Sequence, residues 1–501
     1  MTALHHIELR RGTYRDSVQL LQVSQAVSGL DGVTGAMVAM GTELNLELIA
    51  GMGFALPDDA SAGDMIVAIA ATDETTRDSA LAALESALAA KTPAVSTDAT
   101  VPPPRTVGAA VVTAGADLVL ISTPGRYAFA DAVDALDAGA SVLVFSDNVP
   151  VEQEIALKDL AAERGLLVMG PDCGTAVVGG VGLGFANVVR PGPIGLVAAS
   201  GTGAQQALAL LDAAGVGVSH CLGVGGRDLS AEVAGRSTLA ALDALDADPA
   251  TETILVISKP PAPAVADAVR AHAATLSKPV VFGLLGRDRP DLTAVVTEVL
   301  GADAPASWPK WLPTDEPRDL VAPFSTGSGA LRGLFSGGTL ADEAMVIASA
   351  ALGPIASNIP LDPAWALGSD LKTDGHATID FGDDALTAGR PHPMIDGTLR
   401  LDRLAVEAAD PSCRVVLLDV VLGHGAHPDP ASELAPAIAS ALGVADRPFD
   451  VVIALVGTSG DPQGLQRQAD ALRGVGARVY LSNAEAAREA VAILKPSEVT
   501  E

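Results

Sequence analysis

The sequence predicts a multidomain α/β protein built on parallel sheets. Short apolar runs that suit buried strands alternate with stretches that carry alanine and leucine at helical spacing. Several of these runs end in glycine-rich turns that lead directly into a helix, the pattern of βα units in open parallel sheets. At 501 residues the chain is long enough for about three or four domains, each with its own core.

Composition narrows the possible partners and compartment. The chain is 49% apolar and 3% aromatic, so its cores must be built from alanine, valine and leucine. A net charge of −30 without a basic cluster argues against nucleic acid as a partner. No apolar run approaches the roughly 20 residues of a membrane span, and the first residues lack a signal-peptide pattern, so we expect a cytoplasmic protein away from membranes. Three widely separated cysteines argue against a disulfide framework or a zinc site.

The chain divides into four predicted domains and a linker. Residues 1–95 alternate short strands with helices and form a small α/β domain, followed by a stretch rich in Pro, Ser and Thr at 93–106. The remaining parts are a Rossmann-like domain at 106–190, an α/β domain at 191–300, a proline-containing linker at 301–328 and a last α/β domain at 329–501.

The central motif lies where the run Ile194 to Ala199 ends. The turn Ser200, Gly201, Thr202 and Gly203 follows it, and a helix is expected from Gln205. A helix N-terminus leaves backbone N–H groups unpaired and carries the positive end of the helix dipole, so it receives anions well. The alternative is an ordinary small-residue turn with an N-cap.

Two further turns repeat this chemistry. One is Ser336, Gly337, Gly338 and Thr339; the other is Thr458, Ser459 and Gly460. Each follows an apolar run, and we expect the turns to bind anions. We further expect the helix starts near Ser200 and Ser336 to converge on one pocket.

Charged residues supply candidates for catalysis. Arg390 and His392 lie in a proline-punctuated loop with several aspartates, where arginine can grip phosphate or carboxylate and histidine can move a proton. Internal Asp–Arg pairs that merely hold the loop are the alternative. Arg227 and Asp228 follow another glycine pair, and the aspartate either orients the arginine or caps the next helix. His424 and His427, together with Asp429, could bind a divalent metal, but their loose spacing is weak evidence for a metal site.

Longer motifs carry a family resemblance. GPDCG at 170–174, IGLVAASGTGAQQ and GVGGRD resemble the α subunit of succinyl-CoA synthetase. GLFSGGTLADEA, IDFGDDALTAGRPHPMID and LLDVVLGHGAHPDP resemble the FdrA family. The resemblance implies a CoA-binding-type Rossmann domain followed by two flavodoxin-like ligase domains, the second similar to the carboxyl-terminal domain of the synthetase β subunit. One chain would then join what the synthetase divides between two subunits.

The resemblance implies two activities. One is carbamoyl transfer between carbamoyl phosphate and oxamate, and the alternative is acyl-CoA synthesis. The chain lacks the synthetase's first loop, GFTGxxG, and has Arg287 to Pro290 where a phosphorylated histidine would follow Lys278 to Gly286. Both departures favour carbamoyl transfer, with the SGTG and SGGT turns holding phosphoryl oxygens. Arg390 and Arg227 would hold carboxylate or phosphate, and His392 would act as acid or base.

A third hypothesis is a non-catalytic scaffold subunit of a larger enzyme. We expect a small anionic substrate, either a phosphate ester or a carboxylate. A homo-oligomer or a complex with other enzyme subunits is also expected. No cofactor is assigned, and CoA, ATP and Mg²⁺ stay open.

Overall fold

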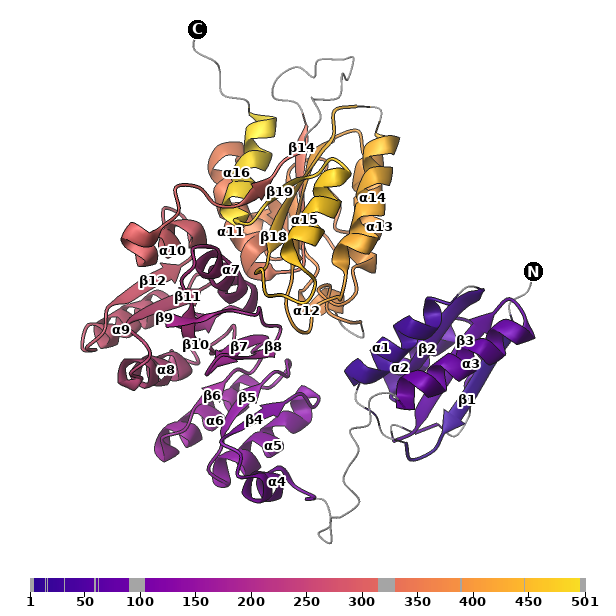
Figure 1. Cartoon of the computed structure of the whole chain (residues 1–501), viewed down its shortest axis with the longest axis horizontal. Helices are drawn as coiled ribbons and strands as arrows, with labels where there is room; N and C mark the ends of the chain where they lie inside the picture. The colour runs from indigo at the N-terminus through magenta and orange to yellow at the C-terminus, as the bar shows by residue number, and fades with distance from the viewer. Residues whose placement is uncertain are drawn as a thin grey trace. The chain divides into compact units, whose positions relative to one another are not determined.

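The computed structural model of the chain describes residues 4–89, 104–313 and 329–495, apart from positions 14, 16, 31, 58, 59, 62, 388, 389 and 446. The chain forms two compact units, Met1–Pro103 and Pro104–Glu501. Each unit is an α/β structure, as predicted (Figure 1). Within the described residues no helix has the length and apolar character needed to cross a membrane.

The first unit is a three-stranded antiparallel sheet with helices on both faces. Its strand order is β1-β3-β2, and the central strand β3 is buried along its whole length. Helices α1 and α3 pack on one face, whereas α2 packs on the other. The elements are β1 (Leu4–Arg10), α1 (Ser17–Ser28), β2 (Val33–Met40), α2 (Glu43–Gly51), β3 (Met65–Ala71) and α3 (Glu74–Ala89). Most of the proline-rich stretch at 93–106 lies outside the described residues.

The second unit begins with a small parallel sheet of order β4-β5-β6. Alanine-rich helices pack on it, which explains how a core with few aromatic residues closes. The elements are α4 (Val107–Ala114), β4 (Leu118–Ile121), α5 (Gly125–Asp137), β5 (Ser141–Val144), α6 (Val151–Arg164) and β6 (Val168–Met169). This is the βαβ unit that the sequence predicts.

A six-stranded sheet follows, with order β12-β11-β9-β10-β7-β8. Strands β9 to β12 are parallel, and the hairpin β7–β8 adds antiparallel strands at one edge. The elements are β7 (Thr175–Val178), β8 (Val181–Gly184), β9 (Pro191–Ala199), α7 (Gly201–Ala213), β10 (Val218–Gly223), α8 (Arg236–Ala247), β11 (Thr253–Ser258), α9 (Pro263–Ala273), β12 (Val280–Leu284), α10 (Leu292–Leu300) and the 3-10 helix η1 (Gly301–Asp303). Residues 175–184 thus pair with this sheet, although the predicted boundary lay at 190.

The last sheet has seven strands in the order β13-β19-β18-β17-β14-β16-β15. All are parallel except β13, which pairs antiparallel with β19. The strands are β13 (Lys310–Trp311), β14 (Ala330–Phe335), β15 (Ala356–Ser357), β16 (Ala377–Asp380), β17 (Cys413–Val421), β18 (Asp450–Val456) and β19 (Arg478–Tyr480). The helices are α11 (Gly338–Leu352), η2 (Pro363–Trp365), α12 (Asp384–Thr387), α13 (Thr398–Ala409), α14 (Pro430–Val444), α15 (Leu465–Gly474) and α16 (Asn483–Leu494). Part of the predicted linker is therefore a strand of this sheet.

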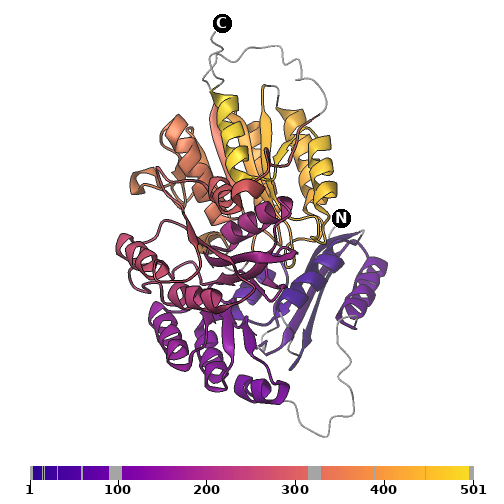
Figure 2. The same ribbon diagram turned by 60° about the vertical axis from the view of Figure 1, so that its left-hand side comes forward.

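Helix α7 joins the two large sheets. Every residue from Gly203 to Asp212 is buried, because the helix packs on its own sheet and also against α10 and α11. Most of its buried residues are apolar, as expected for a helix in such a position, and the buried amides of Gln205 and Gln206 donate to Leu422 O and Leu481 O. One continuous core includes leucines of β9 and α7 together with Leu331, Leu340 and Leu417. Both views show the two sheets side by side (Figures 1 and 2), and this packing brings the starts of α7 and α11 together.

Candidate functional site: a junction of two helix starts

The starts of α7 and α11 are in direct contact. Ser200 caps α7 by accepting a hydrogen bond from the Gly203 N–H at 3.0 Å. The same Ser200 hydroxyl donates to Thr339 Oγ1 at 2.6 Å, in the first turn of α11. We call the group Ser200 to Gly203 and Ser336 to Thr339 the two-helix junction. The positive ends of two helix dipoles meet there, which favours a bound anion.

Close packing explains the glycines of the second turn. A Cβ atom on Gly337 would lie 2.7 Å from the Thr202 side chain. A Cβ atom on Gly338 would lie 2.6 Å from Asp380 Oδ2 and 2.9 Å from Lys259 Nζ. These glycines therefore let α11 approach α7 and place charged groups beside the backbone. Gly201, Thr202 and Gly338 keep partial solvent exposure, so they form the accessible part of the junction.

Ser336 has a different role from the predicted one. Its N–H and hydroxyl both donate to Asp419 Oδ1, and the Gly337 N–H donates to Asp419 Oδ2 at 2.9 Å. Asp419 is fully buried and pairs with Arg400 at 3.2 Å. A carboxylate of the protein thus takes the anion position that the sequence assigns to a ligand at Ser336. The accessible side of the junction is the one near Gly201 and Gly338.

Lys259 supplies a positive charge at the junction. It directly follows β11, at the carboxyl end of the sheet, and its side chain is 42% exposed. Its Nζ lies 3.9 Å from Asp342 Oδ2. Lys259 is not among the residues predicted from the sequence motifs. A lysine directly after an apolar run at a strand end is nevertheless a usable signal, because ligands bind at that edge of open α/β sheets.

Two carboxyl groups beside Lys259 have shifted acidity. Burial raises the pKa of Asp380 to about 7, and the Lys259 charge opposes the shift. Burial also raises the pKa of Asp342 to about 6, again opposed by Lys259. The backbone N–H of Gly382 donates to Asp380 Oδ1 at 2.9 Å, whereas Oδ2 faces Gly338. A carboxyl group with a pKa near neutrality beside an anion site is suited to proton transfer.

The structure places the predicted acid or base His392 near Asp380. Both His392 Nε2 and Asp380 Oδ1 lie about 3 Å from the position that a Cβ of Gly382 would take. Burial, together with the charge of Arg400, lowers the pKa of His392 to about 4. The Met394 N–H donates to its Nδ1 at 3.2 Å, and Phe185 packs on the ring. His392 is therefore neutral at pH 7 and is not poised to exchange a proton there, so Asp380 is the better candidate for this role.

The other predicted catalytic residues do not belong to the two-helix junction. Arg390 is exposed, and its side chain forms no hydrogen bond or ion pair with the described residues. Arg227 pairs with Glu154 at 2.9 Å and donates to Val149 O. Asp228 is fully buried, pairs with Lys158 at 2.7 Å and accepts the N–H groups that start α8. Of the two roles foreseen for Asp228, the structure gives it the helix cap, because its oxygens cannot reach a ligand.

The third turn also serves the fold. Thr458 Oγ1 donates to Val188 O at 2.6 Å, and its N–H donates to Asp461 Oδ2 at 2.7 Å. Gly460 lies against Val188, and α15 begins only at Leu465. The turn of Thr458, Ser459 and Gly460 therefore attaches the segment before β9 to the last sheet, through the contacts of Thr458 and Gly460 with Val188. It does not form a helix N-terminus that could bind an anion. The sequence pattern resembles the other turns, but the Thr458 donors are already paired within the protein.

Metal ligands are not gathered in the described part of the chain. No group of three or more His, Cys, Asp or Glu is arranged there to hold a metal ion. His427 Nδ1 accepts the Asp429 N–H, and the Asp429 carboxylate is held by Arg467 and Gln468. These hydrogen bonds give His427 and Asp429 a structural role.

The fold and the carboxyl-terminal sequence define the class of protein. Residues 334–493 match the family described as CoA-ligase, and residues 1–102 match the family described as AllF, heavy metal-associated domain. The sequence has no cysteine before Cys173, so no thiolate is available for a metal in that first region. The chain thus combines a carboxyl-terminal region similar to CoA-ligases with an amino-terminal region similar to another family.

The chain belongs to the family of YahF, an uncharacterised protein of Escherichia coli K12. The two are 38% identical over 490 residues, which is 94% of this chain and 95% of YahF. The malate–CoA ligase α subunit of Methylorubrum extorquens AM1 is 28% identical over 198 residues, covering 38% of this chain and 66% of that subunit. The ADP-forming succinate–CoA ligase α subunit of Aquifex aeolicus is 32% identical over 161 residues, covering 31% of this chain and 52% of that subunit.

The comparisons discriminate between the predicted activities. They support a relation to acyl-CoA ligases, the predicted alternative, and give no support to carbamoyl transfer to oxamate. A solved acetyl-coenzyme A synthetase of Ca. Korarchaeum cryptofilum aligns with 77% of this chain and 85% of its own at 14% identity and a TM-score of 0.29, too low for any argument. The FdrA assignment stays a prediction.

Substitution of Gly338 tests how tightly the junction is built. We expect Gly338→Ala to weaken inorganic phosphate binding by about tenfold, because the new methyl group displaces Lys259 and Asp380 from the helix start. Isothermal titration with phosphate measures the change. Gly443→Ala in α14 is the matched control, since nothing lies within 4 Å of a Cβ there. Equal phosphate affinity in both variants would contradict the assignment.

Proposed function

We propose that the chain transfers an acyl group between phosphate and a thiol acceptor, as an enzyme of the acyl-CoA ligase class. The observation that carries the proposal is the Ser200–Thr339 contact, which joins two helix starts beside Lys259. A phosphate held there gains from two dipoles and one ammonium group. The names of the curated relatives support CoA as the acceptor.

The proposed step breaks one bond and forms one. The acyl carbon loses its bond to a phosphate oxygen and gains a bond to the thiol sulfur. Phosphate leaves toward Lys259 and the N–H groups near Gly201 and Gly338. Asp380, ionised in about half of the molecules near its pKa of about 7, takes the thiol proton.

The sequence after Gly286 favours the part of a ligase reaction that starts from an acyl phosphate over the part that needs a phosphohistidine. Arg287 to Pro290 contains no histidine, so a phosphohistidine relay has no carrier in this segment. A reaction that starts from an acyl phosphate needs no such carrier. For the acceptor, Arg126 in the first turn of α5 is exposed near the carboxyl end of β4, where it would hold a phosphate of CoA.

Turnover of the purified full-length chain tests the proposal. With acetyl phosphate or succinyl phosphate and CoA, we expect thioester formation with one phosphate released per thioester. Lys259→Ala should lower kcat/KM by about 10²-fold, because a charged contact to the leaving phosphate is lost. The exposed Lys372→Ala is the charge-matched control and should leave kcat/KM unchanged.

Two other results would change the assignment. Carbamoyl phosphate turnover with oxamate, without any thioester formation, would overturn the thiol acceptor and restore the carbamoyl-transfer hypothesis. Absence of turnover with every acyl phosphate, together with phosphate affinity that Lys259→Ala does not alter, would overturn the phosphate site and favour a scaffold role.

A further inference from the structure

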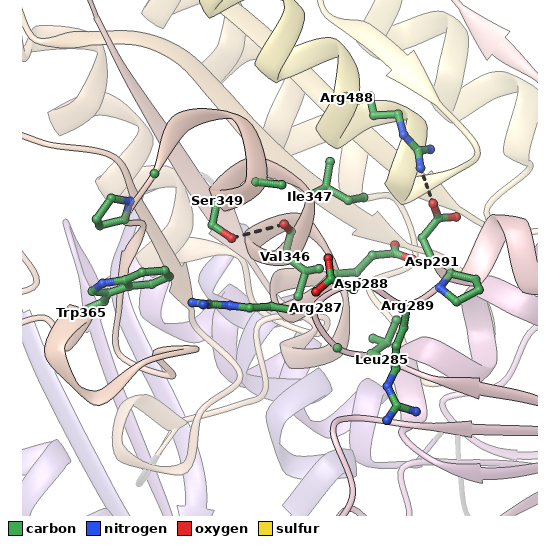
Figure 3. Close-up of a pocket in the computed structure, with 16 residues that line it drawn as sticks. Leu285, Arg287, Asp288, Arg289, Asp291, Val346, Ile347, Ser349, Trp365 and Arg488 are labelled. Carbon is green, nitrogen blue, oxygen red and sulfur yellow. Dashed lines mark hydrogen bonds and ion pairs between the residues drawn. The ribbon is translucent and has the colours of Figure 1, made fainter.

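A pocket lies between the six-stranded sheet and the last sheet, and none of its lining residues belongs to the two-helix junction. Its volume is about 520 Å³, within the usual range for small-molecule sites. One wall is the segment Leu285 to Asp291, and the other is the later part of α11 with Trp365 of η2 (Figure 3). The lining residues of α11 run from Glu343 to Ala350, about 8 to 18 Å along the helix axis from Gly338. The pocket therefore shares no residue with the two-helix junction.

Two arginines on the first wall lack anionic partners. Neither Arg287 nor Arg289 forms a side-chain hydrogen bond or ion pair with the described residues. The Arg287 guanidinium lies 5.0 Å from the centre of the Trp365 ring, and Figure 3 shows it extending across the pocket toward that ring. A guanidinium group held over an aromatic ring keeps its N–H edges available for an anion.

The other charges of the pocket cancel only part of the positive charge of these two arginines. Arg488 pairs with Asp291, as the dashed line in Figure 3 shows. Burial raises the pKa of Glu343 to about 7, so this carboxyl group is partly protonated at neutral pH. Only Asp288 then faces Arg287 and Arg289 among the lining residues. In a chain with 61 acidic and 31 basic residues, this is a local region of positive charge, which concentrates anions.

Apart from Ser349, whose hydroxyl donates to Val346 O, the rest of the lining is apolar or glycine. Val346, Ile347 and Ala350 of α11 form this surface together with Pro354. An apolar wall, an indole ring and an available guanidinium group together select a ligand with a flat apolar body and one anionic group.

We propose that this pocket is a second binding site, for a small organic anion in which a planar apolar group carries a phosphate or a carboxylate. Arg287 holds the anionic group, and Trp365 with the wall of α11 covers the planar group. The site does not depend on the activity proposed for the two-helix junction.

Binding of phenyl phosphate and of benzoate to the full-length chain tests this site. We expect calorimetry to detect binding of at least one of the two. Binding of phenyl phosphate would show that a phosphate suffices as the anionic group, and binding of benzoate would show the same for a carboxylate. Phenol, which has the ring without the charge, should bind at least about tenfold more weakly. Inorganic phosphate, which has the charge without the ring, should do the same in Lys259→Ala, where the phosphate binding proposed for the junction is weakened. Arg287→Gln should weaken binding by about tenfold, since it removes a charge-assisted hydrogen bond.

The chain offers a matched control for this substitution. Arg270 on α9 also lies over an aromatic ring, Phe282, at 5.7 Å, but outside the pocket. Arg270→Gln should leave the affinity unchanged. Trp365→Leu should weaken ligands with a ring and leave the binding of inorganic phosphate unaltered.

Three results would overturn the proposal. They are failure of both aromatic anions to bind, equal affinity in Arg287→Gln and the parent chain, and loss of binding in Lys259→Ala but not in Arg287→Gln. The last result would assign the aromatic anions to the two-helix junction, and it would leave the proposed function intact.

Discussion

Replacing Asp380 by asparagine is expected to lower the rate of acyl transfer by a factor of about 10² to 10⁴, the usual contribution of a general acid or base. Asparagine keeps the shape of the side chain, and its oxygen can still accept the Gly382 N–H bond that Asp380 Oδ1 accepts. It cannot take a proton from the acceptor. Because Lys259 and the helix starts remain, phosphate affinity should change little. The measurement is kcat under saturating acyl phosphate, compared with the exposed Asp402→Asn as control.

The same substitution should change two pH dependences. The parent activity should fall as pH drops below the Asp380 pKa of about 7, and this limb should disappear in Asp380→Asn. Stability should change in the opposite sense. A carboxyl group whose pKa is raised by folding binds its proton more tightly in the folded state, so stability is lost as pH rises from about 4 toward 7. Asp380→Asn should therefore raise Tm more at pH 8 than at pH 5. An unchanged activity profile would contradict the role of Asp380.

Asp419→Ala is expected to lower the free energy of unfolding by about 3–5 kcal/mol, the usual cost of removing one partner of a buried ion pair. Asp419 is fully buried and accepts three hydrogen bonds from Ser336 and Gly337. Its loss leaves the Arg400 charge and two backbone N–H groups without their main acceptor in the core. The turn before α11 should open, and phosphate binding should be lost with it.

Chemical and thermal unfolding of Asp419→Ala measure this cost, with Asp402→Ala as the exposed control. The double variant Asp419→Ala with Arg400→Met should be more stable than Asp419→Ala alone, because the unpaired buried charge is gone. A single variant as stable as the control would show that Asp419 does not hold the turn.

The local patterns of the sequence predicted much of the fold. Apolar runs followed by glycine turns located β9 with α7 and β14 with α11, since each pattern reflects contacts within one βα unit. The hairpin β7–β8 and the strand β13 were assigned to other parts. Their pairing with distant strands leaves no trace in nearby residues. The same reason explains why Asp419, 83 residues from Ser336, was not connected with that turn.

The candidate site was predictable in part. Ser200 and Thr339 were named from their turns, and the structure brings these turns into contact. The Thr458 turn has the same composition, yet its donors bind Val188 and Asp461, and composition alone cannot reveal such partners. His392 illustrates a further limit. Its proline and arginine neighbours led to its prediction as an acid or base, whereas burial lowers its pKa to about 4, too low for proton exchange at neutral pH. Lys259 and Asp380 became candidates because both lie beside Gly338 in the folded chain. The three residues are far apart in the sequence, so this proximity could not be predicted from it.

The covalent continuity of the second unit has a kinetic consequence. The helices α7 and α11 belong to different sheets, but both lie on one polypeptide between residues 201 and 352. Their encounter is intramolecular, so its effective concentration is fixed by the chain and not by the amount of protein present. An anion site assembled in this way does not come apart on dilution. Its specific activity should stay constant over enzyme concentrations at which a site shared between separate subunits would dissociate.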